Sequence, residues 1–208
     1  ITDSSGTVSR TYNDQNQLLT IGSTTLAYDN NGNVTTDDQG HTLVYDAWNR
    51  LVEVKNGSTV IQQFGYDDQG RMITITHWMG GSSTLHIYYD GWRAIQENLG
   101  QFDVEIQNIF SPVYVDAVIL RYEYSDDSGE FDETPERTYL MQDAKYNVTA
   151  MMTYDSGSGE FNVAYFVWYD SYGSTDFRDG AWGTSTNWLG MEFLHQGLRY
   201  DGTVGLYD

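Results

Sequence analysis

The chain has 208 residues, enough for one sizeable β domain, and 15% of them are aromatic. Thirty acidic against 10 basic side chains give a net charge of -20, which argues against nucleic acid and anionic membrane surfaces as partners. The absence of cysteine excludes disulfides and thiolate metal sites, and no apolar run reaches the roughly 18 residues of a membrane-spanning helix.

A short unit recurs along the first hundred residues. It reads Tyr-Asp-Asn-Asn-Gly-Asn-Val from Tyr28, and further copies start at Tyr45 and Tyr66. A degenerate copy starts at Tyr12, and the copies from residue 89 onward drift further from the pattern. A fixed unit at a spacing of about 20 residues indicates a repeat architecture.

Each unit predicts a strand, a tight turn and a second strand. An Asp side chain accepts a bond from a backbone N–H two residues on, and the following Gly or Asn tolerates a left-handed backbone. One hairpin cannot bury its own face, so we expect consecutive antiparallel hairpins to join into one long all-β sheet. The residues assigned to these structural turns are Tyr28, Asp29, Gly32, Tyr45, Asp46, Asn49, Tyr66, Asp67 and Gly70.

Longer hairpins are expected in the second half. A long Gly-, Ser-, Thr- and Trp-rich loop is predicted at 173–190. The chain is therefore interpreted as a single segment, 1–208, with regular repeats over 1–100 and longer hairpins and loops over 101–208. Both ends fall within repeat-like sequence, so a fragment of a longer chain is expected. The predicted strands are 113–124, 137–142, 148–154 and 162–169.

One acidic turn has the composition of a depleted calcium loop. Asp126, Ser128 and Asp132 could supply oxygen ligands around a central Gly129. That alignment places Tyr124 and Pro135 where the first and last carboxylates of a calcium loop belong. We therefore expect a solvated acidic hairpin and no cofactor, with calcium as the one candidate metal.

No catalytic constellation is apparent, and the chain is not expected to be an enzyme. The four histidines lack metal-ligand spacing, and no nucleophile elbow is present. Thirty acidic residues make chance carboxylate pairs inevitable, so such pairs are uninformative. Several tryptophans could stack on sugar rings or belong to the core: Trp78, Trp92, Trp168, Trp182 and Trp188.

The repeat unit resembles the YD repeats of RHS proteins. Residues 111–118, 142–150 and 196–207 resemble the late part of a bacterial RHS core. The resemblance implies a long sheet that spirals into a hollow shell, in secreted or cell-surface proteins whose shells often enclose a C-terminal toxin.

The first hypothesis for function is a non-catalytic structural segment of a β-shell or fibre in a large secreted or cell-surface bacterial RHS-like protein. The alternatives are an extracellular binding or adhesion module for a glycan or receptor, and a shell piece of a self-cleaving toxin precursor. Expected partners are neighbouring repeats of the parent chain or identical subunits, with an enclosed C-terminal toxin or a glycan as further candidates. Nucleic acid and a membrane span are not expected.

Overall fold

The structure is a computed structural model in which strands account for nearly all regular structure. It describes residues 2–3, 6–7, 9–78, 81–100, 103–114, 117–125, 131–169, 175–185, 192–201 and 206–207. In these residues the one helical element is a short 3-10 turn, η1 (His195–Gly197), and none forms a helix of the length and apolarity needed to span a membrane. The predicted all-β class is confirmed.

The strands pair antiparallel with their neighbours in the chain. Hydrogen bonding runs through fifteen strands, from β20 back to β6 in unbroken reverse chain order. Smaller sheets are formed by β1 with β2, by β3 to β5, and by β21 with β22. The order of consecutive hairpins is what the recurring unit predicts. The contacts divide the chain into two units, Ile1–His86 and Ile87–Asp208.

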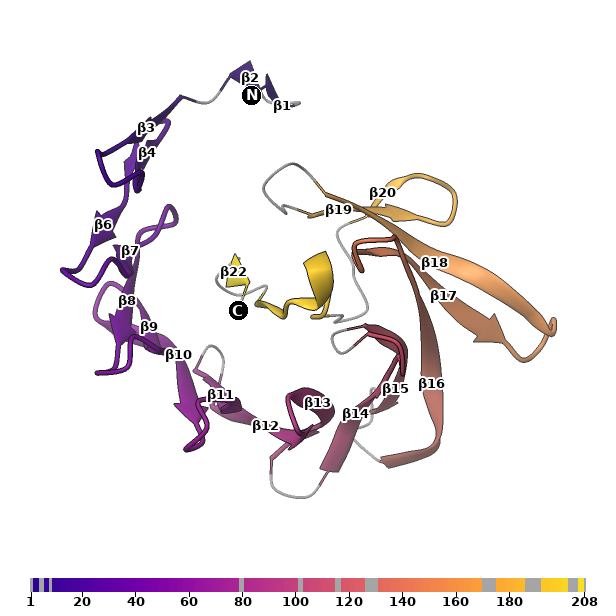
Figure 1. Cartoon of the computed structure of the whole chain (residues 1–208). Coiled ribbons are helices and arrows are strands. Elements are labelled where there is room, and N and C mark those ends of the chain that lie inside the picture. The colour runs from indigo at the N-terminus through magenta and orange to yellow at the C-terminus, as the bar shows by residue number, and fades with distance from the viewer. Residues whose placement is uncertain are drawn as a thin grey trace. The chain divides into compact units, whose positions relative to one another are not determined.

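The first unit contains strands of two to eight residues, with the longer ones in its second half (Figure 1). They are β1 (Thr2–Asp3), β2 (Gly6–Thr7), β3 (Arg10–Tyr12), β4 (Leu18–Ile21), β5 (Thr24–Thr25), β6 (Ala27–Tyr28), β7 (Val34–Thr36), β8 (His41–Tyr45), β9 (Leu51–Asn56), β10 (Thr59–Tyr66), β11 (Met72–His77) and β12 (Ser83–Asp90), which extends past the unit boundary.

Alternation of side chains decides which face of the first unit is apolar. Leu43 and Val54 are direct cross-strand partners, and both are buried. The adjacent pair, Val44 and Glu53, points to the opposite face because successive strand residues alternate. The register of the strands therefore determines which side chains lie on the apolar face and which lie on the opposite face.

The second unit has longer strands. They are β13 (Arg93–Leu99), β14 (Asp103–Phe110), β15 (Val118–Ser125), β16 (Phe131–Gln142), β17 (Val148–Asp155), β18 (Glu160–Tyr169), β19 (Thr175–Asp179), β20 (Thr184–Ser185), β21 (Tyr200–Asp201) and β22 (Leu206–Tyr207).

The core of the second unit combines strand residues with the segment around η1. Val118, Leu140, Met151 and Val167 from β15 to β18 pack together with Leu194, which is fully buried. The N–H of Val148 donates to the carbonyl of Leu194 at 3.0 Å. Residues near the C-terminus therefore complete a core built mainly by the sheet (Figure 1).

Two expectations about the second half were wrong in detail. The predicted loop at 173–190 contains the β19–β20 hairpin. Asp179 starts a tight turn there, and the sequence of this turn lacks, at its fourth position, the Gly or Asn that marks the regular copies. The strand expected at 113–124 begins only at Val118, after bends at Pro112 and Val113. The other predicted strands lie within β16, β17 and β18.

Candidate functional site: the aspartate turn and its tyrosine clamp

A five-residue turn closed by an aspartate side chain recurs along the chain; we name it the aspartate turn. In the copy that starts at Asp67, Oδ1 accepts bonds from the N–H groups of Gln69 and Arg71, both at 2.9 Å. The backbone closes the same loop, since Gly70 donates to the carbonyl of Asp67 at 3.1 Å. One carboxylate oxygen thus satisfies two backbone donors that a tight turn would leave unpaired.

The fourth position of the turn has a left-handed backbone. Gly32 (φ 93°), Gly70 (85°), Asn49 (62°) and Asn16 (64°) occupy it. These are residue types for which a positive φ costs little. Among the described residues, this turn is found at 13–17, 29–33, 37–41, 46–50, 67–71, 143–147 and 179–183, the first of which starts with Asn in place of Asp.

Two of these turns escaped the sequence analysis. The turns at 37–41 and 179–183 follow Thr36 and Arg178, whereas the regular units begin with Tyr. An Asp followed three residues later by Gly would have revealed the first. The second was hidden because Trp182 holds the left-handed position, with φ 69°.

The fifth residue of the turn returns its side chain to the carboxylate. Arg71 Nε donates to Asp67 Oδ2 at 2.7 Å, and Arg50 Nε donates to Asp46 Oδ2 at 2.8 Å. Asn33 Nδ2 makes the corresponding bond to Asp29 at 2.8 Å. Both carboxylate oxygens are therefore occupied by groups of the same turn.

These bonds hold the aspartates in the charged form. Hydrogen bonding from the Asn33 side chain is the largest influence on Asp29, and its pKa lies below the usual value although partial desolvation opposes the shift. At Asp67, desolvation raises the pKa, but the N–H and guanidinium of Arg71 outweigh it and the net pKa is lowered. Carboxylates held ionised are acceptors only and carry no proton to donate.

Tyrosines of the repeat connect one turn to the next. The Tyr66 hydroxyl donates to the carbonyl of Leu51 at 2.7 Å, and Tyr28 donates to Leu18 at 2.8 Å. Each acceptor is the residue directly after the preceding aspartate turn. In the second unit Tyr169 repeats the contact at 2.8 Å with Val148, the residue after the turn at 143–147. We call this bond the tyrosine clamp.

Side chains add further links between successive turns. The guanidinium of Arg50 lies 4.6 Å from the Tyr66 ring centroid and 5.2 Å from that of Trp48. Asn49 Oδ1 accepts bonds from the Asn31 and Asn33 amides, at 2.9 and 3.0 Å. Neighbouring turns are therefore joined at their edges as well as through the sheet.

The residues considered as metal ligands or catalytic groups do not come together in the described part of the structure. Asp126 and Ser128 lie outside the described residues, and for Asp132 only the backbone, in β16, is described. His41 belongs to the turn at 37–41, with Nδ1 2.8 Å from Asp37. Across the described ranges, no group of three or more His, Asp or Glu side chains is arranged to hold a metal ion.

A buried ion pair in the second unit was not foreseen. Arg199 Nη2 lies 3.2 Å from Glu97, which is 2% exposed, and it also contacts Glu192. The two partners are 102 residues apart in sequence, so no local pattern indicates the contact. This pair ties the segment around η1 to β13.

Consecutive antiparallel hairpins, closed by recurring aspartate turns and linked by tyrosine clamps, make this chain a β-sheet of repeated hairpins. The RHS Repeat family model matches residues 45–82, which include the turns at 46–50 and 67–71. This match confirms the predicted resemblance to RHS/YD-repeat proteins.

Two curated relatives and one solved structure are similar to nearly all of this chain. The chain is 25% identical over 209 residues to the tRNA3(Ser)-specific nuclease WapA of Bacillus spizizenii and 26% identical over 229 residues to the tRNA nuclease WapA of Bacillus subtilis. Each match covers 98% of this chain but only 8% of the relative. The crystal structure of TcdB2-TccC3-TEV matches 97% of this chain and 11% of that chain, with a TM-score of 0.51 and 14% identity.

Proposed function

We propose that this chain is a non-catalytic wall segment of an RHS-type β-shell in a large secreted or cell-surface protein. The observation that carries the proposal is the internal use of the repeated side chains. In the turns that start at Asp29, Asp46 and Asp67, the Asp carboxylate bonds to the Asn or Arg of its own turn, and Tyr28 and Tyr66 bond to the residue after the preceding turn. In these described turns the repeated side chains are used to build the sheet.

The electrostatics support a wall and not a nuclease. RNA carries a dense negative charge, and a chain with a net charge of -20 repels it. The turn carboxylates are held ionised by their own backbone, which suits a structural acceptor and not a general acid. Since the chain spans 8% of the WapA relatives, we assign the nuclease activity named for them to parts outside the matched region.

The proposal is tested by incubating the purified chain with tRNA and following cleavage on a denaturing gel. We expect the tRNA to remain intact, while a ribonuclease control cleaves it fully. Cleavage that co-purifies with the chain, and that a single substitution such as Glu97→Gln abolishes without unfolding the chain, would contradict a non-catalytic role.

The partners in this proposal are neighbouring repeats. The long sheet begins with β6 and ends with β20, and the outer strands of a sheet are where further strands pair. Additional hairpins of a parent chain, or identical subunits, would pair there, and a toxin domain would be the enclosed cargo.

Export is tested by treating intact cells that make the parent protein with a protease. The protease should digest or release the repeat region if that region lies outside the cell.

A further inference from the structure

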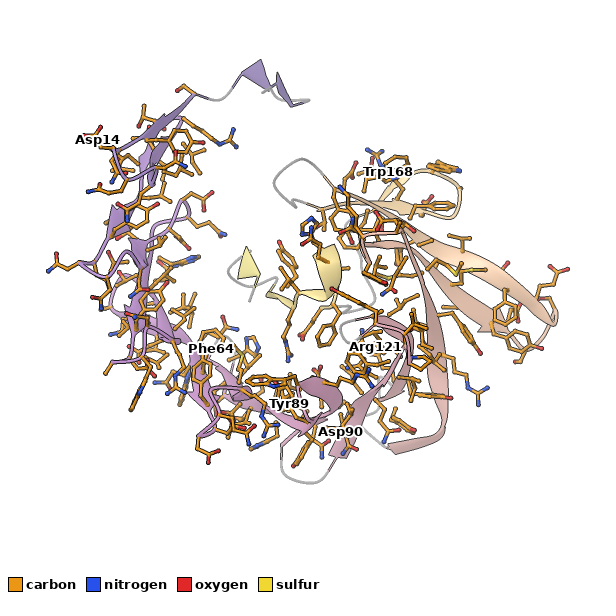
Figure 2. All side chains as sticks on the ribbon, viewed as in Figure 1. Asp14, Phe64, Tyr89, Asp90, Arg121 and Trp168 are labelled. Atoms are coloured by element: carbon orange, nitrogen blue, oxygen red, sulfur yellow. The ribbon has the colours of Figure 1, made fainter. Side chains whose placement is uncertain are left out.

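The outer face of the β18–β19 hairpin carries aromatic side chains that remain partly exposed among the described residues. Strand pairing places Phe166 opposite Arg178 and Trp168 opposite Asp176. Because residues two apart in a strand share a face, these four side chains lie on one side of the hairpin. Trp168, labelled in Figure 2, is 54% exposed.

The other face of the same hairpin has the opposite character. Val167 and Phe177 are cross-strand partners, and Val167 is buried while Phe177 packs against the core of the second unit. With the core on that side, alternation predicts polar residues on the outer side. Aromatic residues at Phe166 and Trp168 therefore depart from what the fold requires.

A third ring is brought to this face by the β19–β20 turn. Trp182 stacks on Phe166, with centroids 4.3 Å apart and planes 16° from parallel. Its ring centroid lies 6.1 Å from that of Trp168 at an angle of 51°, and Trp182 remains 57% exposed. The two indoles form two sides of an open hollow.

The backbone of Trp182 is strained. It occupies the left-handed position of an aspartate turn, with φ 69°, where most copies have Gly or Asn. A bulky residue at positive φ is destabilising and tends to occur at functional sites. Stability of the turn alone would favour Asn or Gly, so the ring itself accounts for the choice of residue.

Polar groups complete the rim of the hollow. Arg178 donates to Asp176 Oδ2 through Nε at 3.1 Å and to the Thr184 hydroxyl through Nη1 at 2.9 Å. The hollow has a volume of about 270 Å³ and is lined by Trp168, Asp176, Arg178 and Trp182. It presents two exposed ring faces beside a fixed cation and a carboxylate.

We propose that this hollow, named the Trp168–Trp182 site, binds a pyranose ring of a neutral carbohydrate. A sugar ring has an apolar C–H face that fits an indole and hydroxyl edges that exchange hydrogen bonds with a carboxylate and a guanidinium. Asp176 at the rim and a net charge of -20 disfavour acidic sugars. Apolar walls with a few fixed polar groups are the usual composition of a small-ligand site.

The test is a titration of the 208-residue chain with cellohexaose, with N-acetylchitohexaose and with a proline-rich decapeptide, followed by tryptophan fluorescence. We expect a saturable change with at least one of the two oligosaccharides. Trp168→Ala is expected to weaken the binding by about tenfold or more, because it removes one stacking face. Trp48→Ala is the matched control, since Trp48 is 75% exposed in another aspartate turn.

The decisive variant is Trp182→Asn. Asn suits the left-handed position, as Asn49 does in its own turn, so the melting temperature should stay equal or rise while oligosaccharide binding is lost. Three results would overturn the proposal: no saturable response to either oligosaccharide up to roughly 10 mM, binding that survives Trp182→Asn, or a response to the peptide alone.

Discussion

The left-handed position of the aspartate turn decides which residues a turn accepts. At Gly70 the φ is 85° and a Cβ would meet nothing within 4 Å, so only backbone strain limits substitution there. Tyr146 and Trp182 show that aromatic residues can hold this position, at φ 63° and 69°. Tyr146 stacks on Tyr114 at 3.6 Å, so its ring has a partner that offsets part of the strain.

Gly70→Val is therefore expected to destabilise the chain by about 1–3 kcal/mol, since a β-branched side chain is forced into positive φ. Gly70→Asn serves as the control and should lose less than about 1 kcal/mol, because Asn tolerates this conformation. Urea denaturation of both variants provides the comparison. Equal losses would show that backbone conformation does not set the cost.

The charge of the turn aspartates makes their contribution depend on pH. The pKa of Asp67 is lowered in the folded chain, so its stabilisation is present above the unfolded value, about 3.9, and is lost as pH falls through the folded pKa. Asp67→Asn should lower the melting temperature at pH 7, and the difference from the unmodified chain should shrink below about pH 4. Thermal melts from pH 7 to pH 3 test this, and a difference that is constant with pH would contradict it.

Residue-level signals in the sequence were sufficient for the regular turns. An Asp with Gly or Asn at the fourth position of the turn predicts the hydrogen bonds of that turn, as at Asp29 and Asp67. They failed at Asp179, because Trp182 stands where the pattern requires Gly or Asn. The role of that ring depends on Phe166, which only the strand register brings beside it.

At the scale of elements, the tyrosine clamp explains why the unit begins with Tyr. The hydroxyl of Tyr66 reaches over one hairpin to the carbonyl of Leu51, so this repeat is bonded to the preceding one beyond the sheet ladder, as are those of Tyr28 and Tyr169. The sequence showed the regular spacing of Tyr but not the acceptor, because the acceptor is a backbone atom in another hairpin.

Tyr66→Phe should remove one such bond and destabilise the chain by about 0.5–1.5 kcal/mol. The matched control is Tyr88→Phe, because Tyr88 is 45% exposed on β12 and loses a hydroxyl of the same kind. Both variants are compared by chemical denaturation. The clamp would have no energetic role if the two substitutions gave the same change.

At the scale of the whole molecule, the repeat pattern does not predict contacts between residues that are far apart in the sequence. The Glu97–Arg199 pair and the packing of Leu194 draw the segment around η1 into the core of the second unit. The sequence around Glu97, Arg199 and Leu194 contains no local pattern that indicates these contacts. Long-range pairing of this kind follows from the folded topology, which periodicity and turn chemistry do not specify.

Arg199→Met should leave Glu97 as a buried charge without its cation and destabilise the chain by about 3–5 kcal/mol. The double variant Glu97→Gln with Arg199→Met should recover a substantial part of that loss, since no charge then remains unpaired at Glu97. Denaturation of the two single variants and the double variant completes the cycle. Strict additivity would show that the pair has no coupling.

The central claim, that this chain is part of a β-shell wall, is tested most directly by electron microscopy of an intact parent protein that carries it. We expect a closed hollow particle whose wall includes the consecutive hairpins from β6 to β20. An extended filament, or a particle in which this chain forms a separate globule outside the wall, would contradict it.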